Sequence, residues 1–496
     1  MRPHAPRYKS LADLSRFLGV EDQIGNAAQV IFAGLTTSTK YIEKNDLFVA
    51  LPGSKSHGAN FTAQAKENGA IAILTDVEGL RISGEILPAI VIEDPRVRVG
   101  DVASWFYEAP FNALHAVGIT GTNGKTTTAA LLNEIWNLSN RESGCIGTVG
   151  ISIGKENFPT NFTTPESTEL QSIVASMVER STHFLVMEVS SHAISQDRIN
   201  GARFKNVAFT NLTQDHLDYH GSMQNYFATK AELFSAEFAD QGFINIDNPY
   251  GMKLLEISQI PVQTVSRNSR SATWHYVKHE ISSKGYEVSI RGVGGILIEG
   301  FLPLLGSYNL DNALMAIALA VDSGVDPLAI GNDLSRLKGP AGRLERVDIG
   351  QKFLAFVDYA HTPDAVEQVL AAVREITSGR VIGVLGCGGD RDNSKRPLMG
   401  KALTQGCDFA VMTSDNPRSE NPEDILRHMS TGIDFGTSSH VEPDRRGAIA
   451  IAVAEAEPGD CVIVLGKGHE IGQEISGIKY PFDDRLELAR AIERLT

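Results

Sequence analysis

The chain has 496 residues, more than one hydrophobic core normally serves, so we expect two to four domains. Its composition, with 42% hydrophobic and 21% charged residues, is that of an ordinary globular protein. A net charge of −15 argues against nucleic acid or an anionic membrane surface as a partner, because both attract a basic face. No apolar run is long enough to cross a bilayer, and the N-terminus lacks the apolar stretch of a signal peptide.

Four cysteines are scattered along the chain without a Cys-x-x-Cys pair. The sequence therefore predicts neither a disulfide framework nor a zinc site. This use of cysteine is typical of a reducing compartment, so we expect a cytoplasmic protein. We also expect a monomer that binds neither nucleic acid nor membrane.

Short apolar strands alternate with helical patterns along the chain, which indicates an α/β fold built on mainly parallel sheets. The first section contains predicted strands at 46–53 and 70–75 and ends near 105–111. The middle section contains predicted strands at 114–119, 184–189, 206–210 and 242–246, a β-rich stretch at 272–304 and a helix at 309–320. A second boundary falls near 338–343, and strands follow at 353–357, 381–385, 409–412 and 461–465.

The stretch Thr120-Gly-Thr-Asn-Gly-Lys-Thr-Thr127 lies between a predicted strand and a predicted helix at 128–136. Such a turn presents backbone N–H groups and a helix N-terminus to phosphates. Lys125 can reach a terminal phosphate, and the Thr126 hydroxyl can hold Mg²⁺. The first glycine of the usual P-loop spacing would fall on Ile119, so a purely structural turn is the alternative. The position between strand and helix favours nucleotide binding.

Two acidic features follow in the same section. Glu188 ends a predicted strand, where a carboxylate can bind Mg²⁺ directly or through water, or simply cap the next turn. Asp215-His-Leu-Asp-Tyr-His220 is dense in metal-binding groups, and His216 and His220 would share a face if the segment were helical. A divalent-metal hydrolase is thus an open alternative, although a magnesium–nucleotide site accounts for this cluster and for the P-loop together.

Taken in order, these segments resemble the Mur ligases, ATP-dependent enzymes that form amide bonds in peptidoglycan synthesis. The resemblance covers essentially the whole chain and is carried by residues 121–126, 188–192, 211–220, 226–234, 306–313, 342–345 and 358–363. Within the family, residues 163–165, 388–392, 395–397 and 466–470 resemble the member that adds the third stem-peptide residue to UDP-N-acetylmuramoyl-L-alanyl-D-glutamate. Asp415-Asn-Pro-Arg418 resembles the motif of members that select meso-diaminopimelate over lysine.

The resemblance implies three domains: residues 1–110 for the UDP substrate, 111–340 as a central P-loop ATP-binding domain, and 341–496 as a Rossmann-like domain for the amino acid. It implies an ADP-forming carbon–nitrogen ligase in which ATP phosphorylates the D-glutamate γ-carboxylate and the amine of diaminopimelate attacks the acyl phosphate. The residues agree with this chemistry, because a free carboxylate does not form an amide in water without activation. A P-loop with Mg²⁺ brings two anions into contact.

The resemblance also implies roles for individual residues. ATP is expected at Gly121, Thr122, Asn123, Gly124, Lys125, Thr126, Thr127, Asn309, Arg343 and Asp358. Mg²⁺ is expected at Thr126, Glu188, His216 and Lys230, with Lys230 carbamylated by CO₂ to N6-carboxylysine. The muramoyl dipeptide is expected at Ser38, Thr163, Thr164, Ser190, Gln196 and Arg198. The amino acid is expected at Arg391, Asp415, Asn416, Arg418, Gly466 and Glu470. Lys125, Lys230 and His361 are expected to act in catalysis.

The sequence departs from the family pattern at two places. The Asp-Ser-Arg expected near the uridine is Thr37-Ser38-Thr39, so only Ser38 carries over. The Asn that usually precedes Thr-Thr-Pro is Phe162, with Asn161 one place earlier.

Three alternatives to the diaminopimelate ligase remain from the sequence. One is the same ligase using L-lysine, which Arg418 disfavours because a free distal carboxylate calls for a cation. Another is a folylpolyglutamate synthetase, which shares the P-loop and the modified lysine but not the muramoyl-peptide residues. The third, from a different class, is a P-loop switch that binds ATP and signals through a partner.

Overall fold

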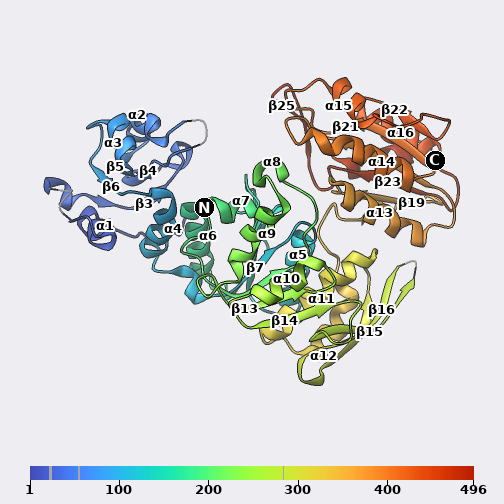
Figure 1. Cartoon of the computed structure of the whole chain (residues 1–496), viewed down its shortest axis with the longest axis horizontal. Coiled ribbons are helices and arrows are strands. Elements are labelled where there is room, and N and C mark those ends of the chain that lie inside the picture. Colours follow the sequence, from blue (N-terminus) through green and yellow to red (C-terminus); the bar gives the residue numbers. More distant parts are fainter. Residues whose placement is uncertain (22–24, 54–55, 283, 496) are drawn as a thin grey trace.

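Three β-sheets follow one another along the chain, and each has its own helices (Figure 1). The computed structural model describes residues 1–21, 25–53, 56–282 and 284–495. The predicted α/β class is confirmed, because most neighbouring strands in all three sheets are parallel. None of the helices in these described ranges combines the length and apolar character that crossing a bilayer requires.

The first sheet has four parallel strands in the order β3-β4-β5-β6: β3 (Gly34–Thr36), β4 (Asp46–Val49), β5 (Ala70–Thr75) and β6 (Ala89–Val91). A short ladder of β1 (Lys9–Ser10) and β2 (Ile31–Phe32) lies apart from it. The accompanying helices are α1 (Leu11–Leu18), α2 (Thr62–Glu67), α3 (Val77–Ser83) and α4 (Pro95–Phe106). Helix α4 packs against α6 of the next unit, and the Ser172 hydroxyl of α6 donates to the Met1 carbonyl at 2.9 Å.

The second sheet has eleven strands in the order β10-β9-β8-β11-β7-β12-β13-β14-β15-β16-β17. Its central strands are parallel: β8 (Ser143–Gly147), β11 (Phe184–Glu188), β7 (His115–Thr120), β12 (Phe204–Phe209), β13 (Ala239–Asn245) and β14 (Val262–Ser266). The outer strands are β9 (Gly150–Ile153), β10 (Glu156–Phe158), β15 (Trp274–Ser282), β16 (Gly285–Arg291) and β17 (Leu297–Leu302). The helices are α5 (Lys125–Leu138), α6 (Ser167–Glu179), α7 (Ser191–Ser195), α8 (Leu217–His220), α9 (Met223–Ala231), α10 (Pro249–Ile257), α11 (Ser307–Asp322) and α12 (Pro327–Asp333).

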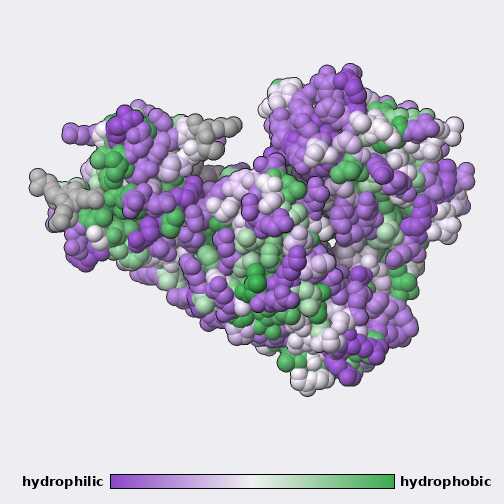
Figure 2. Space-filling model, in the orientation of Figure 1, coloured by the Kyte–Doolittle hydropathy of each residue, from purple (hydrophilic) through white to green (hydrophobic). Residues whose placement is uncertain are grey.

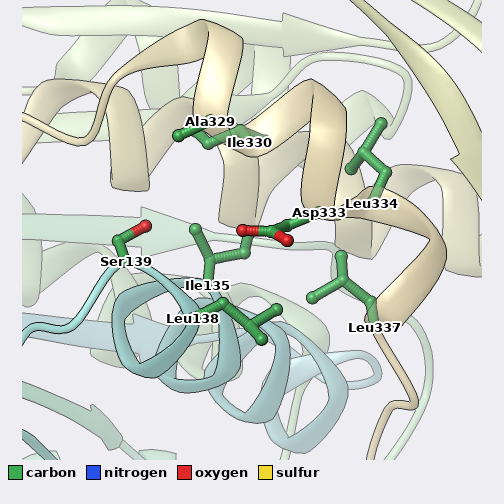
Figure 3. A pocket seen from close by; sticks show the side chains of 8 residues that line it. All are labelled: Ile135, Leu138, Ser139, Ala329, Ile330, Asp333, Leu334 and Leu337. Carbon is green, nitrogen blue, oxygen red and sulfur yellow. The ribbon is translucent and has the colours of Figure 1, made fainter.

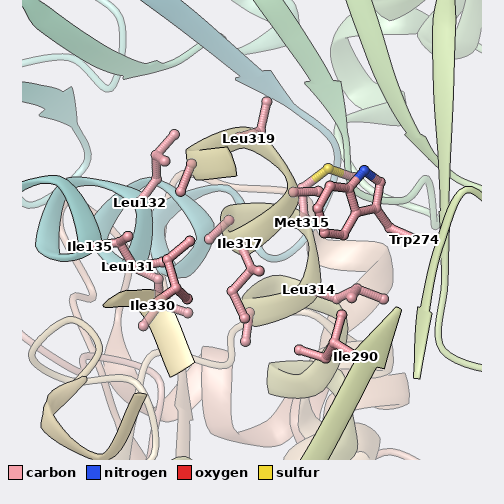
Figure 4. Close-up of a cluster of buried hydrophobic side chains, with 14 of the residues drawn as sticks. Leu131, Leu132, Ile135, Trp274, Ile290, Leu314, Met315, Ile317, Leu319 and Ile330 are labelled. Carbon is pink, nitrogen blue, oxygen red and sulfur yellow. The ribbon is translucent and has the colours of Figure 1, made fainter. Parts of the chain in front are cut away.

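Alternate residues of β7 enter separate cores on the two faces of this sheet, as the two-residue period of a strand requires. Val117 and Ile119 pack in the core formed with α5 and α11, to which Leu132, Ile317 and Trp274 also belong (Figure 4). The gap between α5 and α12 in Figure 3 holds only about 10 Å³ and is lined mainly by aliphatic side chains. It is a packing defect rather than a ligand site.

The third sheet has six strands in the order β18-β19-β23-β20-β21-β22, with all but β18 parallel. They are β18 (Glu345–Arg346), β19 (Leu354–Asp358), β20 (Val381–Cys387), β21 (Phe409–Ser414), β22 (Ser439–Val441) and β23 (Cys461–Leu465). The helices are α13 (Pro363–Ile376), α14 (Arg396–Gly406), α15 (Pro422–Met429), α16 (Arg445–Ala454) and α17 (Asp484–Glu493), and β24 (Gly472–Ile475) pairs with β25 (Ile478–Pro481) in a hairpin.

The three units enclose a broad hollow on one face of the molecule. Figure 2 shows the indentation between the N-terminal unit and the C-terminal unit, above the central one. Helices α7 and α8 lie at this indentation in Figure 1. In open parallel sheets, ligands bind beyond the carboxyl ends of the strands. The predicted site residues follow those ends in both the second and the third sheet, as described below.

Candidate active site

The P-loop turn joins β7 to α5, and two glycines give it its shape. Gly121 has φ 151° and Gly124 has φ 86°, both in the region that favours glycine. A Cβ at Gly121 would lie 1.9 Å from Thr210 Oγ1, and one at Gly124 would lie 2.3 Å from Asn312 Oδ1. Lys125 Nζ donates to the carbonyls of Gly121 and Thr122, both at 2.9 Å, so its ammonium lies over the loop.

A buried carboxylate lies beside the start of α5. Glu188, at the end of β11 and 1% exposed, accepts hydrogen bonds from Thr126 Oγ1 (2.9 Å) and from the backbone N–H of Thr148 (2.7 Å). The Thr148 hydroxyl also donates to it at 3.2 Å. Hydroxyl and carboxylate oxygens are the ligands that Mg²⁺ prefers, so Thr126 and Glu188 fit a magnesium site. The described residues hold no group of three His, Cys, Asp or Glu side chains arranged for a metal, so phosphate and water would supply further ligands.

Lys230 lies on α9 and is only 1% exposed. Its Nζ donates to the Gly121 carbonyl at 2.9 Å and lies 4.8 Å from the centre of the Tyr226 ring. Burial lowers its pKa well below the usual value, and repulsion from Lys125 lowers it further. The surroundings therefore favour the neutral amine.

The histidine cluster is arranged differently from the helix considered in the sequence analysis. Helix α8 is a single turn, and His216 precedes it in a left-handed conformation with φ 54°, so no continuous helix carries both His216 and His220. His220 Nε2 is 2.9 Å from Ser191 Oγ, whereas His216 Nε2 is 3.4 Å from Asp215 Oδ2. Burial lowers the pKa of His216 to about 4, so its imidazole is neutral at pH 7 and able to bind a metal.

A polar cavity of about 240 Å³ opens beside the P-loop. Its lining includes Asn123, Gly124, Asn211, Arg267 and Asn312. Asn309, one of the residues predicted for ATP, does not line this cavity. Asn309 Nδ2 donates to the Leu305 carbonyl at 2.8 Å, and its Oδ1 accepts from Asn312 Nδ2 at 3.1 Å. Asn312, three residues further along α11, therefore faces the cavity in its place.

The C-terminal unit touches the P-loop directly. Arg343 NH2 is 3.5 Å from Thr126 Oγ1, and Asn123 Nδ2 donates to Asp364 Oδ2 at 3.1 Å. Asp358 instead holds its own unit together, because its two oxygens accept from the N–H groups of Leu344 (2.6 Å) and Ala360 (2.7 Å).

His361 is exposed near this junction, and its Nδ1 lies 2.9 Å from the Tyr359 carbonyl. In this arrangement Arg343 contacts the P-loop hydroxyl, whereas each oxygen of Asp358 accepts a backbone N–H of its own unit.

The residues predicted for the muramoyl dipeptide converge on Glu188. Thr163 Oγ1 is 3.1 Å from Thr148 Oγ1, and Thr164 Oγ1 donates to the Glu188 carbonyl at 2.8 Å. The N–H of Ser190, which caps α7, donates to Thr164 Oγ1 at 3.1 Å. Hydrogen bonds thus connect Thr163, Thr164 and Ser190 to the residue Glu188, whose carboxylate fits a magnesium site.

Arg198 is the cation among the residues predicted for the dipeptide, and its guanidinium contacts the Thr164 carbonyl at 3.3 Å. Its guanidinium donates to Gln196 Oε1 at 2.7 Å and lies 3.0 Å from Glu166 Oε1. Phe162, the departure from the family pattern, lies 4.6 Å from the guanidinium of Arg198 and covers it. Asn161 Nδ2 donates to the hydroxyl of Tyr41 at 3.1 Å, which links this loop to the N-terminal unit near Ser38.

The residues predicted for the amino acid meet at the carboxyl ends of β20, β21 and β23. Arg418, with φ 53°, donates to the Gly389 carbonyl, and its Nε lies 3.8 Å from Glu474 Oε2. Arg391 borders the same loop, since a Cβ at Gly388 would lie 3.8 Å from its Cγ. A Cβ at Gly466 would lie 2.7 Å from Asp415 Oδ2, so only glycine lets that strand end approach the carboxylate.

Three residues around this pocket are not among those predicted from the sequence. Lys467, which is fully buried, donates to Asn416 Oδ1 (3.0 Å) and Glu470 Oε2 (3.1 Å). Gln473 on β24 donates to the Asp415 carbonyl at 2.7 Å. Arg445 on α16 donates to the carbonyls of the residues preceding Asp415 and Gly466. The sequence signal for Lys467 was its place inside 466–470, between two predicted site residues.

Comparison with known proteins identifies the family of this chain. Residues 119–320 match the Mur ligase middle domain, and residues 342–468 match the Mur ligase glutamate ligase domain. The UDP-N-acetylmuramoyl-L-alanyl-D-glutamate–2,6-diaminopimelate ligase of Streptomyces coelicolor is 44% identical over 98% of this chain and 96% of its own. The protein of the same name from Streptomyces avermitilis is 42% identical over 99% and 98%.

A solved structure of a 2,6-diaminopimelate ligase of this name superposes with a TM-score of 0.67 at 32% identity, covering 95% of this chain and 96% of that one. A Mycobacterium tuberculosis folylpolyglutamate synthase shares the fold with a TM-score of 0.62, at 19% identity over 75% of this chain. The chain therefore belongs to the Mur ligase family, whose members are ATP-dependent enzymes that form amide bonds.

Proposed function

We propose that this protein joins meso-diaminopimelate to the D-glutamate γ-carboxylate of UDP-N-acetylmuramoyl-L-alanyl-D-glutamate, with ATP hydrolysed to ADP and phosphate. Relatives that carry this activity in their names match the chain over nearly its whole length. The observation that best supports this function is the contact between the P-loop and the C-terminal unit, which carries the predicted amino-acid pocket. Arg343 of the C-terminal unit contacts Thr126 of the P-loop, and the basic pocket around Arg418 lies in that same unit.

Activation comes first in this reaction. The γ-carboxylate attacks the terminal phosphorus of ATP, the bond to the β,γ-bridging oxygen breaks, and an acyl phosphate and ADP result. Lys125, Arg343 and the N–H groups at the start of α5 offset the negative charge of the two anions as they meet. Thr126 and Glu188 would hold Mg²⁺, which supplies further charge neutralisation at the phosphates when bound.

Amide formation follows. The free amine of diaminopimelate attacks the acyl carbon, and phosphate leaves from the tetrahedral intermediate. Thr163, Thr164 and Arg198 hold the muramoyl dipeptide beside Glu188, so the carboxylate lies next to the phosphate-binding turn. Arg418 pairs with the distal carboxylate of the amino acid and fixes its reacting end toward the junction.

Lys230 carries a carbamate in this proposal. A neutral amine is the form that reacts with CO₂, and burial beside Lys125 favours that form. The product is an anionic oxygen ligand, which together with the neutral imidazole of His216 suits a second Mg²⁺. An unmodified lysine offers Mg²⁺ either an ammonium that repels it or an amine nitrogen in place of the oxygen it prefers, so this second site fits only the modified side chain.

The test is one incubation with ATP, Mg²⁺ and UDP-N-acetylmuramoyl-L-alanyl-D-glutamate, repeated with a panel of amino acids. Phosphate release should require both the nucleotide-linked peptide and meso-diaminopimelate, and mass spectrometry should find the tripeptide product. Phosphate release without either substrate would indicate a P-loop switch instead. Equal rates with L-lysine would assign the lysine-adding reaction.

A further inference from the structure

Lys467 is a buried cation inside the amino-acid pocket. Its residue is 0% exposed, it directly follows Gly466, and it points to side chains rather than to solvent. Nζ lies 3.0 Å from Asn416 Oδ1 and 3.1 Å from Glu470 Oε2. An unpaired buried ammonium would be costly, so these contacts must hold it in one place.

The contact with Asn416 determines which way that amide faces. Oδ1 accepts from Lys467 Nζ and also from the backbone N–H of Glu474, at 3.0 Å each. Both partners can only donate, so the oxygen of Asn416 must lie on their side. Nδ2 then donates to Glu470 Oε2 at 2.8 Å, the same oxygen that Lys467 Nζ contacts. Its second N–H has no acceptor in the described part of the chain.

This orientation makes Asn416 a donor toward any ligand in the pocket. A donor suits a carboxylate and cannot accept a hydrogen bond from an ammonium. Of the residues expected at the amino acid, Asn416 thus suits a carboxylate of the ligand and not its ammonium. Asn416 and Arg418 both offer N–H groups, whereas Asp415 and Glu470 remain as acceptors.

Lys467 also acts on these two acceptors. Burial raises the pKa of Asp415, and Lys467 is the strongest of the groups that oppose that rise. Burial acts on Glu470 in the same direction, but Lys467 and Asn416 outweigh it and lower the pKa of Glu470. The Lys467 ammonium thus limits the rise in the pKa of Asp415 and favours the charged form of Glu470.

We propose that Lys467 is a positioning residue for amino-acid selection: it holds Asn416 as a donor to the distal carboxylate and balances the charge of Asp415 and Glu470. The inference rests on the proposed function, because the carboxylate in question is that of diaminopimelate. L-Lysine lacks this group and would leave the donors of Asn416 and Arg418 unpaired, which costs more than the loss of a contact.

The experiment measures kcat and KM for meso-diaminopimelate, L-lysine, ATP and the UDP-linked dipeptide in the wild type, Lys467→Met and Asn416→Asp. In Lys467→Met, kcat/KM for diaminopimelate should fall roughly 10–100-fold, mainly through KM, with the KM values for ATP and the UDP-linked dipeptide unchanged. Asn416→Asp preserves shape but replaces a donor by an acceptor. It should shrink the preference for diaminopimelate over lysine by at least about tenfold.

Lys401→Met is the matched control, since Lys401 is exposed on α14 of the same unit and should change nothing. Unchanged KM values for diaminopimelate in both variants would overturn the inference. An equal rise in the KM values for diaminopimelate, ATP and the UDP-linked dipeptide would overturn it as well. Asn416→Asp decides the matter if Lys467→Met does not fold. A wild type that ligates no diaminopimelate would contradict the proposed function itself, a result that is distinguishable from unaffected variants of an active enzyme.

Discussion

Lys230 illustrates how burial can convert an ordinary side chain into a reactive one. Its pKa lies well below the usual value, so the amine is available to CO₂. Lys230→Ala should lose at least about 100-fold in ligation rate, because the metal ligand disappears. Short carboxylic acids should restore part of the activity by occupying the vacated position. Intact-mass measurement under CO₂ and steady-state assays check both statements.

The control for this prediction is Lys155→Ala, which removes an exposed lysine from the turn between β9 and β10. It should retain wild-type activity and show no response to added acids. Full activity of Lys230→Ala without any additive would contradict the prediction that a carbamate on Lys230 binds the metal.

Arg418 makes a second prediction at the scale of a single residue. Its guanidinium reaches the Gly389 carbonyl, next to the loop that carries Arg391, and has only a weak ionic contact with Glu474 at 3.8 Å. A charge-assisted pair with the distal carboxylate contributes about 1.5–3 kcal/mol, or roughly 10–100-fold in selectivity. Arg418→Ala should lose this factor in kcat/KM for diaminopimelate relative to lysine. If Arg418→Ala kept the wild-type preference for diaminopimelate over lysine, another group would bind the distal carboxylate.

Sequence reasoning at this scale works where chemistry is local. The P-loop could be predicted because its glycines, lysine and threonine are neighbours in the chain. Asn309 and Asn312 lie one helical turn apart, and only the packing of α11 against the P-loop shows that Asn312 faces the cavity. Lys467 was missed because its acceptors, Asn416 and Glu470, come together only when β21 and β23 end at the same edge of the sheet.

At the scale of elements, strands were predictable when their residues form apolar runs, as in β5, β11 and β23. Five parallel strands were not predicted from the sequence: β3, β6, β8, β14 and β22. The sequences of β8 and β14 show the reason. β8, with the sequence Ser-Gly-Cys-Ile-Gly, has two glycines among five residues, and β14, Val-Gln-Thr-Val-Ser, is mostly polar. Both are held by neighbouring strands rather than by their own propensity, which a local pattern does not contain.

One buried ion pair holds the strand ends of the amino-acid pocket together. Arg445 on α16 contacts Asp484 of α17 through two hydrogen bonds (2.7 and 2.6 Å), and both side chains are 0% exposed. The same guanidinium donates to the Ser414 carbonyl at the end of β21 and the Leu465 carbonyl at the end of β23. Arg445→Met would leave Asp484 buried and unpaired, so we expect a loss of about 3–5 kcal/mol in the stability of the C-terminal unit.

Denaturant unfolding followed by a probe in the C-terminal unit measures this loss. The matched control is Arg427→Met, which breaks the exposed pair of Arg427 and Asp424 on α15 (2.7 Å) and should cost less than about 1 kcal/mol. Equal stabilities of the two variants would show that the buried pair contributes no more than a surface one.

At the scale of the whole molecule, the site is divided between units that meet over a small contact. Most residues predicted for ATP belong to the unit of the second sheet, whereas Arg343, Asp358 and the residues predicted for the amino acid belong to that of the third. The residues predicted for the muramoyl dipeptide lie in the second unit, apart from Ser38 in the first. The link between the second and third sheets passes through Gly339 and Gly342, both with φ 69°. Sites built at such junctions commonly assemble by hinge motion, so we expect closure to accompany turnover.

Gly342 provides a sharp test of that junction. A Cβ there would lie 2.1 Å from the backbone nitrogen of His469, so an alanine must displace the linker from the loop that carries Lys467 and Glu470. The neighbouring Arg343 would move away from Thr126, so the amino-acid pocket would no longer be aligned with the P-loop. Gly342→Ala should therefore lower kcat by roughly 10-fold or more, since misplacement by about 1 Å can cost 100-fold. X-ray scattering should show a smaller decrease in the radius of gyration with all substrates than in the wild type.

Gly350→Ala is the matched control, because Gly350 also has a positive φ, 101°, but nothing lies within 4 Å of its Cβ position. If both variants lost activity equally, backbone strain would explain the effect, and a radius of gyration that stays constant in every ligand state of the wild type would contradict closure altogether.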